Sequence, residues 1–141
     1  MSFALDTNTL SYFMRGEGRV AERLTATPPQ QVALPAIVTY KINFGLRRAG
    51  RRAQLDGFVR MVQVTTVLDF DAEAADHAAR IRLELEAAGT PIGPTDWLIA
   101  ATARGHGRTL VTHNLRQFAR APELEVEDWY QDQITHGNVI A

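Results

Sequence analysis

Short apolar runs alternate along the chain with longer segments in which apolar residues recur at helical spacing. The expected strands are Phe3–Leu5, QVALPAIVT, VTTVLDF, TLVTHN and LEVEDW. The expected helices are TNTLSYFMR, GRVAERLTAT, TYKINFGLRRAG, RRAQLDGFVRMV, DAEAADHAARIRLELEAAG, GPTDWLIAATARGHG and NLRQFAR. This alternation predicts an α/β fold, with a central, mostly parallel sheet of about four to five strands and helices on both faces.

Single residues mark several of the expected boundaries. Asp71 is suited to the N-cap of the long alanine-rich helix, and Gly89 is suited to the position just after that helix ends. Pro94 is suited to the first turn of the GPTDWLIAATARGHG helix. Pro35 lacks a backbone N–H, so we expect it near the end of its strand or in an edge strand.

Length and composition narrow the class of protein without indicating a partner. A chain of 141 residues is long enough for one domain with its own core, and the net charge of −1 gives no general attraction to nucleic acid or membranes. The absence of cysteine excludes disulfides and thiolate metal sites. Neither a signal peptide nor a run long enough to cross a bilayer is visible, so we expect a cytoplasmic protein with no membrane contact.

Polar residues follow the ends of the expected strands. Asp6 ends the first strand, Asn114 follows TLVTH, and Asp96 lies in the first turn of a helix. Each has a plain structural explanation. Asp6 or Thr7 could cap the first helix, and Asn114 could cap the NLRQF helix. Asp96 could be an ordinary acidic residue in a first turn, where the helix dipole stabilises a negative charge. In a parallel sheet, however, strand ends gather at one edge, and converging carboxylates there would suit Mg²⁺ or Mn²⁺.

Several familiar catalytic patterns are missing. The chain has no G-x-G-x-x-G, no G-x-x-x-x-G-K-[ST], no G-x-S-x-G and no H-E-x-x-H, so phosphate-loop, serine-hydrolase and zincin mechanisms are not indicated. We expect the histidines at the surface or in loops: His77, His106, His113 and His136. Trp97 and Trp129 are expected in the core.

Four segments together resemble the successive motifs of a known family. They are LDTN from Leu5, IVTYKINFGLRRAG from Ile37, IGPTDWLIAATA from Ile92 and LVTHNLRQFARAPELEVEDW from Leu110. In this order and spacing they are similar to PIN-domain ribonucleases, and above all to the VapC-type toxins of bacterial toxin–antitoxin pairs. The resemblance implies a single PIN domain over residues 1–141.

The resemblance also implies roles for individual residues. Asp6 and Asp96 match the family's metal-binding aspartates, and Asn114 matches a further position of the catalytic set. Thr112 would be a polar helper, and Asn8 would support the site or face the substrate. The implied cofactor is Mg²⁺ or Mn²⁺, and the implied activity is metal-dependent cleavage of RNA, with tRNA as one candidate.

Lys41 departs from the family pattern, which has a glutamate at this position. One explanation is a wrong alignment, which would leave Lys41 as an exposed helical lysine. The other is a charge reversal inside the site, where two carboxylates and one ammonium sum to −1 and three carboxylates would sum to −3. We predict that Lys41 points into the site, pairs with Asp6 or Asp96, and leaves the metal weakly held and the ribonuclease impaired.

The remaining expectations concern partners. The resemblance implies a small VapB-type antitoxin, a homodimer and an RNA substrate. Arg47, Arg48 and Arg51 are candidates for holding the RNA backbone, although arginines are also ordinary at an exposed helix end. The alternative function is a catalytically silent PIN-fold module that still binds an antitoxin or RNA.

Overall fold

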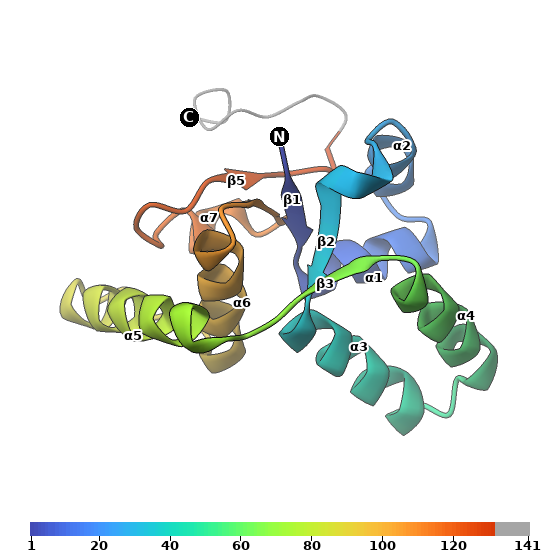
Figure 1. Cartoon of the computed structure of the whole chain (residues 1–141), viewed down its shortest axis with the longest axis horizontal. Helices are drawn as coiled ribbons and strands as arrows, with labels where there is room; N and C mark the ends of the chain where they lie inside the picture. The colour runs from blue at the N-terminus through green and yellow to red at the C-terminus, as the bar shows by residue number, and fades with distance from the viewer. Residues whose placement is uncertain (132–141) are drawn as a thin grey trace.

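The structure is a computed structural model, and it describes residues 1–131. Its strands are β1 (Phe3–Leu5), β2 (Val32–Pro35), β3 (Thr66–Leu68), β4 (Thr109–Val111) and β5 (Val126–Glu127). Its α-helices are α1 (Thr7–Arg15), α2 (Val20–Thr25), α3 (Ala36–Arg48), α4 (Arg52–Gln63), α5 (Ala72–Ala87), α6 (Pro94–Gly105) and α7 (Leu115–Phe118). A short 3₁₀ turn, Pro29–Gln31, precedes β2 (Figure 1).

The strands form one five-stranded sheet in the order β3-β2-β1-β4-β5, and every neighbouring pair is parallel. The predicted α/β class and the parallel sheet are therefore confirmed. Within residues 1–131, no helix is both long and apolar enough to cross a lipid bilayer. The predicted domain extends to residue 141, and its last part, with His136, lies outside the described residues.

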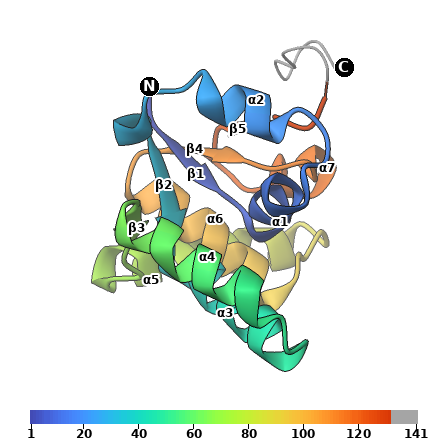
Figure 2. The same ribbon diagram turned by 90° about the vertical axis from the view of Figure 1, so that its right-hand side faces the viewer.

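Helices cover both faces of the sheet. Figure 1 shows α5, α6 and α7 on one side and α1, α2 and α4 on the other, and Figure 2 shows the second group from the front. The three central strands, β2, β1 and β4, are almost wholly buried between these layers, as their apolar sequences require. Trp129 is also buried and meets Phe3 edge-on at 5.0 Å, so its predicted place in the core is confirmed.

The expected boundaries are right in several places. Asp71 caps α5 by accepting a hydrogen bond from the Ala74 N–H, and Pro94 opens α6. Gly89 follows the end of α5 with a φ of +73°, a conformation that glycine adopts at little cost. Pro35 is the last residue of β2, as its missing N–H predicts.

Four of the five expected strands, which correspond to β2, β3, β4 and β5, are shorter in the structure. The segment QVALPAIVT was expected to be one strand, but β2 stops at Pro35 and α3 begins at Ala36. Ile37 and Val38 have high strand propensity, yet Val38 is fully buried as a helical residue, so packing overrides propensity. TLVTHN likewise forms a strand only to Val111, and Thr112 begins the turn that leads to α7.

The strand order determines where a ligand can bind. From β1 the chain crosses to β2 and β3 on one side, and after β3 it returns to β4 on the other side of β1. The carboxyl ends of β1 and β4 therefore border the crevice at which parallel sheets bind ligands. Asp6 follows β1 at this point, and its N–H donates to the Val111 carbonyl of β4 at 3.0 Å.

Candidate active site

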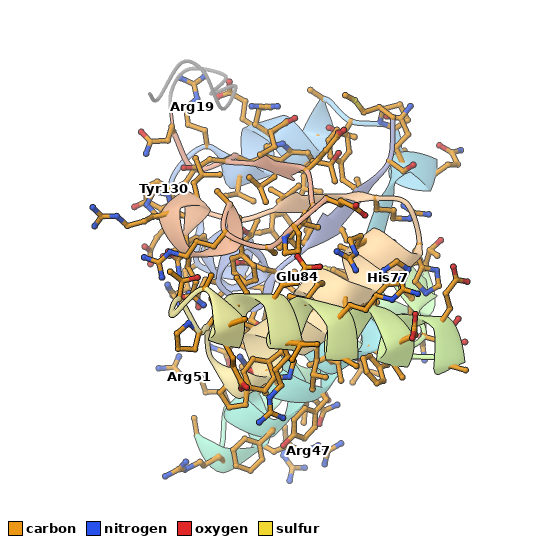
Figure 3. All side chains as sticks on the ribbon, turned by 90° about the vertical axis from the view of Figure 1, so that its left-hand side faces the viewer. Arg19, Arg47, Arg51, His77, Glu84 and Tyr130 are labelled. Atoms are coloured by element: carbon orange, nitrogen blue, oxygen red, sulfur yellow. The ribbon has the colours of Figure 1, made fainter. Side chains whose placement is uncertain are left out.

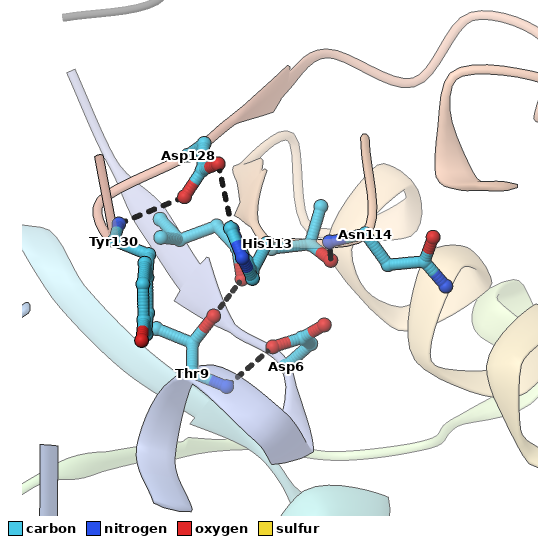
Figure 4. Close-up of polar contacts among 8 residues, drawn as sticks. Asp6, Thr9, His113, Asn114, Asp128 and Tyr130 are labelled. Atoms are coloured by element: carbon cyan, nitrogen blue, oxygen red, sulfur yellow. Dashed lines mark hydrogen bonds and ion pairs between the residues drawn. The ribbon is translucent and has the colours of Figure 1, made fainter. Parts of the chain in front are cut away.

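Asp6 combines a structural role with an unusual electrostatic position. It is the N-cap of α1, and its Oδ1 accepts a hydrogen bond from the Thr9 N–H at 2.8 Å (Figure 4). The side chain is only 4% exposed. Burial raises the pKa of the Asp6 carboxyl, the nearby Asp96 charge raises it further, and hydrogen bonds from Thr112 and Thr9 oppose the rise. The capping explanation is correct, and it leaves a buried carboxylate that favours a cation.

Asp96 faces the same end of the sheet from the first turn of α6. Its Oδ2 accepts a hydrogen bond from Gln117 Nε2 at 2.6 Å. A Cβ atom on Gly93 would stand 2.9 Å from that oxygen, so the absence of a side chain at residue 93 leaves room for the carboxylate. Asp6 and Asp96, the two predicted metal ligands, therefore lie at the same end of the sheet, and the charge of Asp96 contributes to the raised pKa of Asp6.

The turn after β4 supplies the polar groups beside these carboxylates. The Asn114 N–H donates to the Thr112 hydroxyl at 3.0 Å, which ties the turn together. The Asn114 side chain donates to Gln117 Oε1 at 3.0 Å and makes no cap for α7, so the capping explanation of this residue is wrong. Gln117 thus connects Asn114 to Asp96, a role that sequence reasoning missed. Its position three residues after Asn114 on a short helix was the available signal.

Lys41 lies half-buried on α3 and donates a hydrogen bond from Nζ to the Thr95 hydroxyl at 3.1 Å. The half-burial of Lys41 rules out the explanation that it is an exposed helical lysine. Its partner Thr95 directly precedes Asp96, so Lys41 lies beside the candidate site. Among residues 1–131, however, neither Asp6 nor Asp96 forms an ion pair with it, so the predicted pairing is wrong. A half-buried ammonium keeps much of its hydration, and the Thr95 hydroxyl satisfies one donor without desolvating a second charge.

The donor set fits a divalent cation only in part. Two carboxylates, those of Asp6 and Asp96, can provide oxygen ligands, and Mg²⁺ sites can operate with so few when waters complete the coordination. No group of three or more acidic, histidine or cysteine side chains suited to a metal occurs within residues 1–131. The family resemblance implies a third acidic group at the position where this chain has Lys41.

The other predicted residues do not gather at one point. Asn8 is exposed on the first turn of α1. Arg47 donates to Asn43 at 2.5 Å, and Arg48 lies over the Phe44 ring, 6.0 Å from its centroid. Arg51 lines a groove together with Lys41. Arg47 and Arg51 also line one pocket together with Gly50 and Arg52, and Figure 3 shows both toward the end of the molecule that α3 forms.

A second polar cluster, unpredicted from sequence, lies on the other side of the β4 turn. His113 Nδ1 is 2.9 Å from Oδ2 of Asp128, and Oδ1 of Asp128 accepts from the Tyr130 N–H at 2.8 Å (Figure 4). The His113 ring stacks on Tyr130 with centroids 4.2 Å apart. His113 does lie in a loop, as expected, but it also holds that loop to the end of β5. Only the folded chain brings residues 113 and 128 together.

Comparisons with known proteins identify the family of this chain. Residues 3–124 match the PIN domain family. The tRNA(fMet)-specific endonuclease VapC of Salmonella typhimurium is 34% identical over 134 residues, which are 92% of this chain and 98% of the relative. Ribonuclease VapC2 of Rickettsia felis is 33% identical over 102 residues, 70% of this chain and 74% of the relative.

Solved structures give the same result. The DNA-bound VapBC complex from Salmonella typhimurium contains a chain that matches with a TM-score of 0.84 and 33% identity, covering 92% of this chain and 98% of that one. A DNA-bound VapBC2 complex from Rickettsia felis matches with a TM-score of 0.82 and 28% identity, covering 92% and 99%. The chain therefore belongs to the PIN-domain family, among its VapC-type ribonuclease toxins.

Proposed function

We propose that this chain is the toxin of a toxin–antitoxin pair whose Mg²⁺- or Mn²⁺-dependent endoribonuclease activity is impaired by Lys41. The observation that carries the proposal is the position of Lys41 beside Thr95, next to a pair of carboxylates that lacks its third member. A structured RNA such as tRNA is the proposed substrate class, which the name of the Salmonella relative supports.

Asp6 and Asp96 would hold the metal, and the rest of the site would orient them. The Thr9 N–H fixes one oxygen of Asp6, and Gln117 fixes Oδ2 of Asp96. When bound, the metal supplies Lewis-acid polarisation of a phosphodiester and activation of water. Lys41 opposes this arrangement, because a lysine in place of a glutamate removes one oxygen ligand and adds a positive charge that repels a dication.

The proposed partners are a VapB-type antitoxin and a second copy of the chain. The solved relatives are VapBC complexes, which supports an antitoxin partner. The proposed location is the cytoplasm, where such a pair and its RNA would meet. If the metal does not bind, the same fold serves as a catalytically silent module that binds its antitoxin or RNA. The hydrogen bond between Lys41 and Thr95 favours this second candidate, because it stabilises a site without a metal.

Lys41→Glu tests the proposal directly. The substitution restores a third carboxylate, and we expect Mg²⁺-dependent cleavage of a tRNA pool to increase by about 100-fold or more. Lys41→Gln is the matched control, because glutamine has the shape of glutamate and removes the positive charge without adding a negative one. Cleavage is followed on denaturing gels with and without EDTA.

Binding of Mn²⁺, measured by calorimetry, separates the two candidate functions. The parent chain should bind Mn²⁺ weakly, Lys41→Glu should bind it tightly, and Asp96→Asn in the Lys41→Glu background should lose it. Equal cleavage by the parent and Lys41→Glu would show that Lys41 does not impair the site.

A further inference from the structure

A groove of roughly 620 Å³ runs between α1 and α3, and Lys41 stands at the end nearest the candidate active site. We define this α1–α3 groove by its polar lining: Thr7, Ser11, Arg15, Lys41, Arg51 and Gln54. Aliphatic side chains of α1 and α3 form most of the rest, and no acidic residue lines it. The groove is therefore positive although the whole chain has a net charge of −1.

Lys41 and Thr7, which line the α1–α3 groove, can form further hydrogen bonds with a ligand. An ammonium has three N–H donors, and Lys41 donates one of them to the Thr95 hydroxyl. The Thr7 hydroxyl is buried and has no hydrogen-bond partner among residues 1–131. A buried polar atom without a hydrogen-bond partner destabilises the folded protein, and a ligand that forms a hydrogen bond with it removes this penalty. Both groups favour an oxygen-rich anion.

The location of the groove ties it to the carboxylates. Thr7 directly follows Asp6, and Thr95, which holds Lys41, directly precedes Asp96. An anion bound by Lys41 therefore lies beside the pair that would contact the metal. Arg51 lines the same groove, and so does Arg15, whose Nε also donates to Glu17 at 2.5 Å. The negative charges and ribose hydroxyls of an RNA backbone match the cations and hydroxyls of this lining.

The lining also indicates which part of a nucleic acid the groove fits. Base stacking needs aromatic side chains, and no aromatic ring lines the groove. Sequence-independent contact with phosphates and sugars needs cations and hydroxyls, which it has. We propose that the α1–α3 groove is a phosphate-binding subsite for a single RNA strand, with Lys41 contacting the phosphate nearest Asp6 and Asp96.

Gly45 keeps the groove open. It lies inside α3, where glycine is less favourable than alanine by about 1 kcal/mol, yet it lines the groove. A Cβ atom built on Gly45 meets nothing within 4 Å, so a side chain there would extend into open space without a clash. Gly45→Leu can therefore fill the groove while the helix is retained.

This inference rests on the proposal that RNA is the substrate, and its test is independent of cleavage. A fluorescently labelled 12-nucleotide RNA is titrated with each protein in EDTA over a range of salt concentrations. The proteins are the parent, Lys41→Met, Gly45→Leu and the control Arg80→Met. Arg80 lies on α5, away from the groove, and is exposed in an ion pair with Asp76, so its variant controls for the loss of one positive charge.

We expect Lys41→Met to weaken binding by about fivefold at 0.1 M salt and to reduce the slope of log K against log salt by about 0.7, the value for one phosphate contact with a single strand. Gly45→Leu should weaken binding without changing the net charge, and its circular dichroism should match that of the parent. Arg80→Met should bind as the parent does. Inorganic triphosphate should displace the RNA.

Three results would overturn the subsite. They are no binding of RNA by the parent, equal affinity of Lys41→Met and Arg80→Met, or displacement of the bound RNA by a poly-glutamate peptide but not by triphosphate. The last result would assign the groove to an acidic peptide. A failure of Lys41→Glu to cleave RNA would contradict the proposed nuclease and leave these binding results unaffected, so the two failures are distinguishable.

Discussion

Asp6 and Asp128 are both buried aspartates at the carboxyl edge of the sheet, and their surroundings differ. Asp128 is 1% exposed, and its two oxygens are occupied by His113 and by the Tyr130 N–H. Asp6 is 4% exposed and receives hydrogen bonds from Thr9 and Thr112. The negative charge of another carboxylate, that of Asp96, raises the pKa of Asp6 further.

This difference separates a structural carboxylate from a functional one. The partner of Asp128 is part of the fold, so its charge stabilises the junction between the β4 turn and the end of β5. The burial of Asp6 opposes its ionisation, and the hydrogen bonds from Thr112 and Thr9 offset that opposition only in part. A bound cation would favour the ionised carboxylate. Buried carboxylates with raised pKa values are typical of functional sites. The contrast therefore supports Asp6 as a metal ligand in the proposed site.

The largest expected effect on stability comes from Asp128→Asn. The substitution removes a charged hydrogen bond to His113, and we expect the free energy of unfolding to fall by about 1–3 kcal/mol. Urea denaturation at pH 7 measures it. His113→Asn, which removes the other partner, should give a loss of similar sign, and the double variant should lose less than the sum. Additive losses would show that the two side chains do not interact.

Asp6→Asn should raise the free energy of unfolding, whereas Asp128→Asn should lower it. Asparagine caps a helix as well as aspartate does, and it has no charge to desolvate. Because the folded-state pKa of Asp6 is raised, ionised Asp6 destabilises the fold at every pH above the unfolded-state pKa of about 3.9. In EDTA, Asp6→Asn should therefore have a higher Tm than the parent at pH 7.

The pH dependence provides the control. As the pH falls through the raised pKa towards about 4, Asp6 becomes protonated in the folded protein, and the difference between the two proteins should shrink. Differential scanning fluorimetry from pH 4 to 8 measures it. A lower Tm for Asp6→Asn at pH 7 would mean that ionised Asp6 stabilises the fold, as Asp128 does, and the contrast would be lost.

The smallest effect on stability is expected from Gln117→Ala. Gln117 joins Asn114 to Asp96 near the surface, so we expect the free energy of unfolding to change by less than about 1 kcal/mol. In the Lys41→Glu background, however, the variant should weaken Mn²⁺ binding by about tenfold, because Asp96 loses its orienting partner. Arg116→Ala, at the exposed neighbouring position, should leave Mn²⁺ affinity unchanged. Equal affinities in both variants would remove Gln117 from the site.

Local sequence patterns were sufficient for much of the fold. The apolar runs indicated all five strands, and Asp71, Gly89 and Pro94 marked helix ends because caps and turns depend on backbone groups only a few residues away. The same reasoning failed after Pro35, where β-branched residues suggested a longer strand. There the deciding factor was the burial of Val38 against distant parts of the chain.

The sequence by itself determined the α/β class, the family resemblance and the residue types at the strand ends. These include a lysine at a position where the resemblance implies a glutamate. Tertiary structure alone decided that Lys41 bonds to Thr95 and not to an aspartate, that Gln117 connects Asn114 to Asp96, and that Asp128 pairs with His113. These contacts join residues up to 54 positions apart. Such pairs depend on strand order and helix packing, whereas hydrophobic periodicity and capping act over only a few residues.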